Sequence, residues 1–268
     1  MGEGIVRDNN KTRRTEAMIT PKLLKERFLF GVELVDNKGN QMPDKTLQDY
    51  IDIATSMLEH DLDINIVPVT FAGNPLEGGD AEEKDYQAND YWQWGYFQLN
   101  NLPVVEVLEV RAVYPNANIL SYPKEWFKLQ PHDGILRLIP SAGTLSQFAV
   151  DVGGQYFPEI FRSNGHVPLV WQIDYTAGFQ DGKIPMDVNA AIGMIAGIMA
   201  LNIAGDLIAG AGIATKSISL DGLSQSISTT SSATNAGYGA RLIQYDKQIK
   251  SDLATLKNYY LGLQLVVA

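Results

Sequence analysis

The sequence predicts an α+β fold in which a helical core carries an inserted β-rich region. Two observations support this. Apolar residues recur at helical spacing near residue 50 and again toward the C-terminus, whereas the segment from about 101 to 180 is rich in strand-forming residues. The 268 residues are 45% hydrophobic and 19% charged, an ordinary globular composition. Collagen-like, coiled-coil and wholly disordered chains are thereby excluded.

The chain divides into four regions. Residues 1–20 are polar and mixed in charge, with no apolar export segment, and are expected to form a flexible N-terminal arm. Residues 21–71 are expected to be a helical region and residues 72–182 a β-rich insertion. Residues 183–268 are expected to be helical again, interrupted by a Ser/Thr-rich hairpin and ending in an apolar tail.

The first strong helix signal lies near residues 45–60. Asp44 is a candidate N-cap, and apolar residues follow it at helical spacing: Leu47, Tyr50, Ile51, Ala54, Met57 and Leu58. This spacing predicts an amphipathic helix. A short extended piece is expected after it, over residues 64–69.

A polar insert over residues 72–100 ends in an aromatic run made of Tyr86, Tyr91, Trp92, Trp94, Tyr96 and Phe97. Such a run could stack on sugars or bases. It could equally pack one face of a sheet, which we favour because no basic residues interleave with it.

Three strand signals follow. Val104–Tyr114 has strand composition, and Glu106 and Glu109 break its alternation in the manner of a β-bulge. Residues 126–139 predict a hairpin whose turn is supplied by Asp133-Gly134. Residues 167–175 predict a further strand.

The last region predicts two helices. Pro185 marks the start of an apolar helix that runs to about Gly212. Its stretch from 188 to 205 lacks charge, but Asn189 and Asn202 within it favour a buried helix over a membrane span. A small hairpin is expected around Asp221-Gly222, followed by a helix with Tyr238, Leu242, Tyr245, Ile249, Leu253, Leu256 and Tyr260 at spacings of three and four.

Acidic residues are concentrated in one part of the chain. The formal net charge is −10, and residues 31–109 hold 16 acids against three lysines. This charge argues against a surface that coats nucleic acid. The acidic stretch is either a solvated, solubilising face or a surface that repels polyanions.

The candidate enzymatic motifs fail on their residues. With no cysteine, thiolate metal sites and cysteine nucleophiles are excluded. The loop Gly178–Lys183 is one residue short of a phosphate loop and lacks its Ser or Thr. The three histidines are far apart in sequence. We therefore expect no catalytic residue, no metal site, no cofactor and no enzymatic activity.

Two features point to assembly instead. The apolar helix is rich in small residues, among them Gly193, Gly197, Ala200 and Ala204, which allow close helix packing. These residues form either the chain's own core or an interface between copies. The apolar tail contains Leu263, Leu265, Val266 and Val267 and is expected to dock onto a partner, by adding a strand to its sheet or by filling a groove.

The order of several sequence blocks resembles tailed-bacteriophage head-to-tail connector proteins, also called head-completion adaptors or neck proteins. The blocks are Leu29–Leu34 with Asp36 and Gly39, the helix ending at Glu59 with the apolar residues after it, the hairpin 126–140, Ile173–Phe179 with Pro185 and its helix, and Ser217–Ser226 leading to Tyr238–Arg241. The resemblance covers about residues 20–70 and 100–262. The aromatic insert and the β-rich middle depart from simpler, mostly helical members.

The resemblance implies a structural virion protein at the head–tail junction, assembled in the host cytoplasm. Such adaptors form a ring, usually of twelve copies, under the portal protein. They extend the DNA channel without sequence-specific DNA binding, involve no membrane, and dock the next neck or tail component. An alternative is another virion protein, of the tail or head surface, that binds host glycans through its aromatic insert. A third is a soluble enzyme whose site is built from scattered residues.

Overall fold

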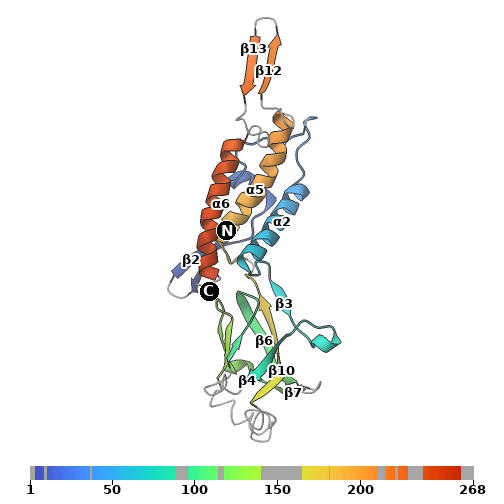
Figure 1. The fold of residues 1–268 in the computed structure, drawn as a ribbon, viewed down its shortest axis with the longest axis vertical. Helices are drawn as coiled ribbons and strands as arrows, with labels where there is room; N and C mark the ends of the chain where they lie inside the picture. The colour runs from blue at the N-terminus through green and yellow to red at the C-terminus, as the bar shows by residue number, and fades with distance from the viewer. Residues whose placement is uncertain are drawn as a thin grey trace, which may run out of the picture. The chain divides into compact units, whose positions relative to one another are not determined.

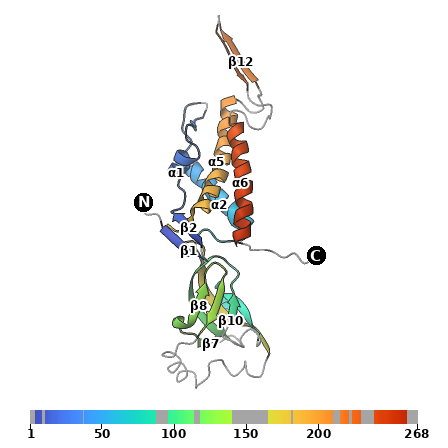
Figure 2. The ribbon, with the colours of Figure 1, turned by 90° about the vertical axis from the view of Figure 1, so that its left-hand side faces the viewer.

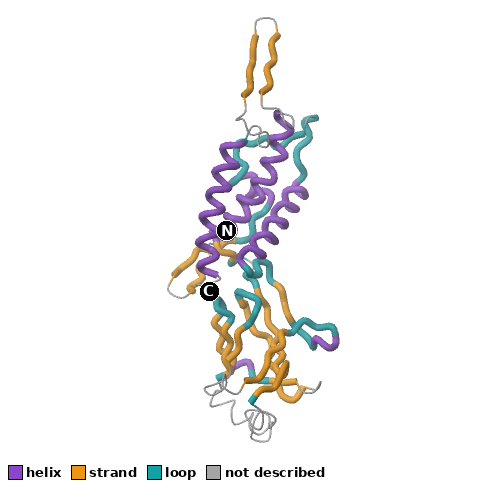
Figure 3. The backbone as a smooth tube through the Cα atoms, in the orientation of Figure 1, coloured by secondary structure: helices purple, strands orange, loops and turns teal. Residues whose placement is uncertain are grey.

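The structure is a computed structural model that describes residues 4–8, 11–36, 38–87, 96–113, 118–139, 165–180, 182–209, 215–220, 223–228 and 238–260. The chain forms two compact units. One contains residues 1–63 and 181–268, and the other contains residues 64–180. Helices gather in the first unit, and strands make up most of the second (Figure 3). The expected α+β fold is confirmed, and the compact β-rich unit begins before the expected boundary at residue 72.

Helix α2 (Asp44–Leu62) confirms the expected helix near residues 45–60. Its buried residues are Leu47, Ile51, Ala54, Thr55, Leu58 and Leu62, which recur at three- and four-residue spacing. Pro43 occupies the N-cap position without a side-chain cap, so the expected Asp44 cap is wrong. Asp44 is instead the first helical residue, and it accepts a hydrogen bond from Lys25 Nζ at 2.6 Å. The helix ends at Leu62, and its C-cap residue Asp63 has a left-handed backbone with φ 51°.

Helix α5 (Met186–Ala209) is the centre of the helical unit and contacts α1 (Pro21–Arg27), α2 and α6 (Gly239–Tyr260). Figure 1 shows α5 between α2 and α6. The stretch Met186–Gly205 is long and apolar enough to cross a membrane, but about two-thirds of its most apolar window is buried inside the protein. That burial matches the expectation of a core helix.

The expected N-terminal arm contains strands. β1 (Gly4–Asp8) and β2 (Lys11–Glu16) form an antiparallel pair, which Figure 2 shows near the start of α5. β2 also pairs with β11 (Ile184–Pro185). The buried amide of Asn189 fixes the segment that follows. Its Oδ1 accepts from Ile19 N at 2.9 Å, and its Nδ2 donates to Glu16 Oε1 and to Ala17 O, both at 2.9 Å. The partner strand lies far along the sequence, so local composition does not reveal this pairing.

The β-rich unit contains two antiparallel sheets. In the larger one, β10 (His166–Ala177) lies between β6 (Val104–Val113) on one side and β3 (Val69–Phe71) with β4 (Glu82–Gln87) on the other. β7 (Asn118–Ser121) extends it beyond β6. The smaller sheet has the order β5 (Tyr96–Gln98), β9 (Ile135–Leu138), β8 (Phe127–Gln130). Short 3-10 turns lie at Pro75–Glu77 and Lys124–Trp126.

Side chains from both sheets share one core, whose fully buried members include Trp126, Leu136 and Trp171. The expected strand from Val104 is confirmed as far as Val113, with Tyr114 outside the described residues, and the expected hairpin within 126–139 and strand 167–175 are also confirmed. The register of β6 against β10 shifts between Asp174 and Tyr175, opposite Glu109 and Val107. This is the irregularity that the glutamates of the sequence indicated.

The Ser/Thr-rich segment contains β12 (Thr215–Leu220) and β13 (Leu223–Ser228), which pair antiparallel with Leu220 opposite Leu223. The expected hairpin is thus confirmed. It is inserted in the sequence between α5 and α6.

Candidate functional site

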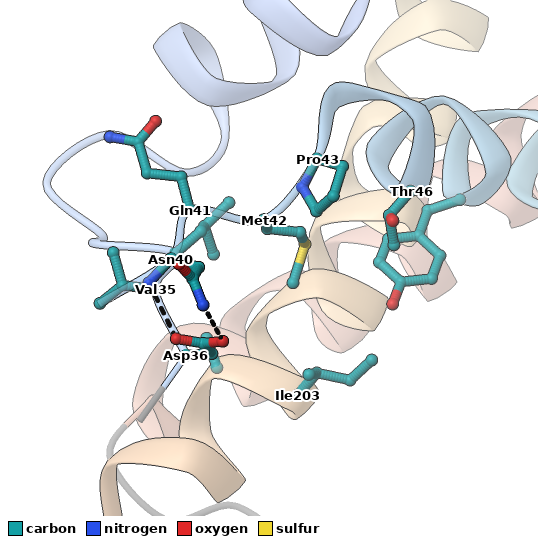
Figure 4. Close-up of a pocket in the computed structure, with 11 residues that line it drawn as sticks. Val35, Asp36, Asn40, Gln41, Met42, Pro43, Thr46 and Ile203 are labelled. Atoms are coloured by element: carbon teal, nitrogen blue, oxygen red, sulfur yellow. Dashed lines mark hydrogen bonds between the residues drawn. The ribbon is translucent and has the colours of Figure 1, made fainter. Parts of the chain in front are cut away.

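An open pocket of about 390 Å³ lies in the helical unit where the loop 34–43 meets the N-terminal turns of α2 and the C-terminal half of α5. In Figure 4, Met42 approaches from the loop and Ile203 from α5. Its remaining lining is contributed by Leu34, Val35, Asp36, Asn40, Gln41, Pro43, Thr46, Tyr50 and Ala204. Seven of the eleven lining side chains are apolar or aromatic, so the pocket suits an apolar side chain rather than a charged ligand.

The loop that forms one wall of the pocket is held by Asp36. Its Oδ1 accepts from the backbone amides of Lys38 and Asn40, both at 2.8 Å, and its Oδ2 accepts from Asn40 Nδ2 at 2.9 Å. Met42 N donates to Leu34 O at 2.8 Å, and an isolated bridge joins Val35 to Gln41. The hydrogen bonds from Asn40, its side chain foremost, lower the pKa of Asp36 below its ordinary value.

The Asp36 carboxylate is therefore occupied in shaping the loop. Among the described residues, no group of three or more His, Cys, Asp or Glu side chains is placed to hold a metal ion. The pocket offers shape and apolar surface, which are the properties of a docking site.

The small residues of α5 that the sequence singled out pack within their own chain. A Cβ atom at Gly193 would lie 2.3 Å from Phe28 Cε2, and one at Gly197 would lie 3.6 Å from both Phe28 Cβ and Tyr245 Cε2. Ala200 and Ala204 are buried. Close packing inside the chain accounts for their size, and an interface between copies at these four residues remains a prediction.

The expected docking residues Leu263, Leu265, Val266 and Val267 lie outside the described residues, as do Tyr91, Trp92 and Trp94 of the aromatic run. The first and last residues of that run, Tyr86 and Phe97, are described. Both are buried in the core of the β-rich unit, and burial raises the pKa of the Tyr86 hydroxyl. These two aromatic side chains serve the core, as the sheet-packing interpretation expected.

A charged cluster is buried in the larger sheet. Arg111 Nη1 donates to Asp174 Oδ2 at 2.7 Å and Nη2 donates to Asp174 Oδ1 at 3.0 Å. Arg111 Nε donates to Gln172 Oε1 at 3.1 Å, and Glu109 accepts from both Arg111 and Ser121. These groups satisfy one another across β6 and β10, so the cluster is structural.

Sequence reasoning missed a set of exposed apolar side chains on the helical unit. Phe30 is 78% exposed, Ile243 56%, and Ile53 and Met57 are each 49% exposed. Met57 was expected on the buried face of its helix, and this expectation is wrong. Met57 lies at the edge of the helix face that contains Leu47, Ile51 and Leu58, on the side toward solvent. Helical spacing alone does not show which edge of that face is open, because this depends on the elements that pack against α2.

No model of a known protein family matches the chain, and no curated protein matches it. A chain from the neck of an empty gene transfer agent particle, computed with C6 symmetry, aligns with 67% of this chain and 76% of its own length, at 17% identity and a TM-score of 0.39. A chain from the virion of a native gene transfer agent particle aligns over the same shares, at 17% identity and a TM-score of 0.38. Likenesses at this level carry no argument about the function of the chain.

Proposed function

We propose that this protein is a structural subunit of a tailed-phage neck, a head-to-tail adaptor that forms a ring under the portal protein. In this role it extends the DNA channel and docks the next neck or tail component. The order of sequence blocks supports the proposal. The blocks correspond to α2, the β8–β9 hairpin, the end of β10 with α5 after it, and the β12–β13 hairpin followed by α6.

The observation that carries the proposal is the apolar surface left exposed on the helical unit. Ile53 and Met57 of α2, Ile203 of α5 and Ile243 of α6 are exposed on helices whose other faces are packed, and Phe30 is exposed in the turn after α1. The pocket beside Ile203 adds an apolar recess. Surfaces of this kind mark interaction sites, and they suit a subunit that buries them on assembly.

The negative charge of the chain favours a channel through which DNA slides, rather than a surface that binds DNA. The chain carries a net charge of −10, and the β-rich unit alone has 13 acids against six bases. A channel wall of the same sign as phosphate disfavours contacts that would hold DNA. The acidic stretch would then let the duplex slide through a ring of, we expect, twelve copies.

Two kinds of contact are expected in this assembly, one with a neighbouring component and one between copies in the ring. The apolar tail with Leu263, Leu265, Val266 and Val267 would dock onto a neighbouring component. Contacts around the ring would be heterologous, because one face of each subunit meets a different face of the next.

Electron microscopy and mass photometry of the purified protein test the proposal, with the protein alone and mixed with the portal of the same phage. We expect the protein to form rings by itself, or to form rings bound to the portal when the two are mixed. A monomer under both conditions contradicts the adaptor function. A matched oligosaccharide-binding screen of the native protein and a Trp92→Ala/Trp94→Ala variant tests the glycan-binding alternative.

A further inference from the structure

The outer face of α2 is acidic and partly apolar. Asp49, Asp52, Ile53 and Met57 are all exposed on it. The whole helix carries five acids against a single lysine. Ile53 and Met57 therefore add exposed apolar area to this charged face.

The outer face of α6 has a net positive charge from Lys247 and Lys250, although Lys250 Nζ also lies 2.6 Å from Asp246 Oδ2 on the same helix. Ile243, Lys247, Lys250 and Ala254 are exposed and follow one another at spacings of four, three and four residues, so they form one stripe along the helix. The helix as a whole carries four bases against two acids. The two faces are thus complementary in charge, and each contains exposed aliphatic groups.

The two helices run in the same direction. Thr46 and Tyr50, near the start of α2, share the pocket with Ile203 of α5, so α2 runs antiparallel to α5. α6 also runs antiparallel to α5, and both α2 and α6 descend in Figure 1.

An ion pair shows which residues of the two helices lie at the same height along their axes. Lys257 Nζ lies 3.7 Å from Asp61 Oδ1, near the C-terminal ends of α6 and α2. Asp52 precedes Asp61 by nine residues, and Lys247 precedes Lys257 by ten. At a rise of about 1.5 Å per residue, Asp52 and Lys247 lie within roughly one residue of the same level. By the same count Met57 is level with Leu253, next to the small exposed Ala254.

We infer that α2 of one copy packs against α6 of the next copy, with Asp49 and Asp52 facing Lys247 and Lys250. This inference rests on the proposed function and names the contact that would build its ring. Rotation about an axis parallel to the helices changes neither their direction nor their height along that axis. In a neighbour related by such a rotation, the acidic residues of α2 therefore lie at the same height as the lysines of α6. Met57 and Ile53 then lie against Ala254 and the aliphatic stems of the lysines. The contact is heterologous, so it propagates from copy to copy and closes when the rotation permits.

The absence of cysteine from the sequence allows a direct test by disulfide trapping. A chain carrying Asp52→Cys and Lys247→Cys should form, on mild oxidation, a ladder of covalent multimers, because each copy bonds to two neighbours. Each single-cysteine variant should give nothing larger than a dimer. A chain with Glu77→Cys and Lys124→Cys, both exposed in the β-rich unit, serves as the control for random collision. We expect the ladder at least tenfold faster than the control, and equal rates overturn the inference.

Charge reversal provides a second, independent test. The variant Asp49→Lys/Asp52→Lys and the variant Lys247→Glu/Lys250→Glu should each assemble at least tenfold more weakly than the native chain. An equimolar mixture should recover assembly, because every contact in an alternating ring then joins opposite charges. Glu77→Lys/Glu125→Lys changes the net charge as the first variant does and should assemble like the native chain.

The outcomes separate this contact from the proposed function. Native rings together with reversed variants that assemble normally, or a mixture of folded variants that stays dissociated, overturn the α2–α6 contact and leave the adaptor function standing. A native chain that is monomeric with and without portal, and gives no ladder, removes both. Circular dichroism of each variant establishes that it is folded.

Discussion

Gly193 lies directly under the ring of Phe28, so close that a Cβ atom on Gly193 would be 2.3 Å from Phe28 Cε2. The ring packs edge-on against Tyr245, with centroids 6.4 Å apart, and the Tyr245 hydroxyl donates to Phe28 O at 2.7 Å. Burial raises the pKa of that hydroxyl. Through Phe28, the segment after α1 is thus fastened to both α5 and α6.

Gly193→Ala should therefore destabilise the helical unit. The added methyl group must displace the Phe28 ring from its place against Tyr245, at a cost of about 1–3 kcal/mol. Gly197→Ala is the matched control, since its Cβ would have 3.6 Å to its nearest neighbours and the helix gains about 0.5–1 kcal/mol from losing a glycine. Urea denaturation measures both. Equal effects of the two substitutions would contradict the close approach.

The ion pair between Arg111 and Asp174 should be strongly coupled to the stability of the β-rich unit. Both side chains are nearly buried. Asp174→Ala removes the nearer carboxylate and leaves the guanidinium only the more exposed Glu109 at 3.2 Å, so it should cost about 3–5 kcal/mol. The double variant Arg111→Met/Asp174→Leu removes both charges and should recover most of this loss. Thermal and urea unfolding check the cycle, with exposed Glu125→Ala as control. A double variant as unstable as the single one would show that the pair is not the source of the loss.

Asp36 should stabilise the pocket loop in a pH-dependent way. Because folding lowers its pKa, the stabilisation is fully present above the ordinary aspartate pKa of about 3.9 and is lost as the pH falls through the lower folded value. Asp36→Asn keeps an acceptor oxygen but cannot titrate. The urea midpoints of the native and variant proteins should differ at pH 7 and converge as the pH falls below the ordinary aspartate pKa and through the lower folded value. A difference that grows on acidification would contradict this sign.

Removal of residues 261–268 should abolish docking of the chain onto its neighbouring component while leaving the fold intact. The deleted segment contains no charged side chain and includes the four apolar residues assigned to docking. Co-sedimentation with the partner measures docking, and the melting temperature reports the fold. The milder variant Leu265→Ser/Val267→Ser should weaken docking in the same direction. Docking that survives the deletion, or a melting temperature that collapses, would refute the assignment.

Much of the architecture could be predicted from local signals. The three- and four-residue spacing around Ile51 marks α2, and the charge-free run after Asp187 marks a buried α5. Asp133-Gly134 lies in the turn of the β8–β9 hairpin, and the strands β12 and β13 pair as the sequence around residues 215–228 predicted. These signals succeed because helix periodicity and turn chemistry depend on residues that are close in the chain.

The candidate sites were much less predictable. The pocket combines the loop around Asp36 with Ile203, which is far away in sequence. Exposure of Met57 could not be deduced, because its spacing fits the apolar set and only the packing of α2 shows which side of that set is open. The pairing of β2 with β11 joins residues near 15 to residues near 184. Such contacts carry no local signature.

By itself, therefore, the sequence determined the secondary elements, the α+β class, the acidic balance and the absence of cysteine chemistry. Only the tertiary structure decided which strands flank β10 and where apolar side chains stay exposed. It also decided that Asp61 of α2 and Lys257 of α6 form an ion pair, which places the ends of the two helices at the same height. The physical reason is that periodicity and turns are fixed by neighbours in the chain, whereas burial and charge register are fixed by segments that meet only after folding.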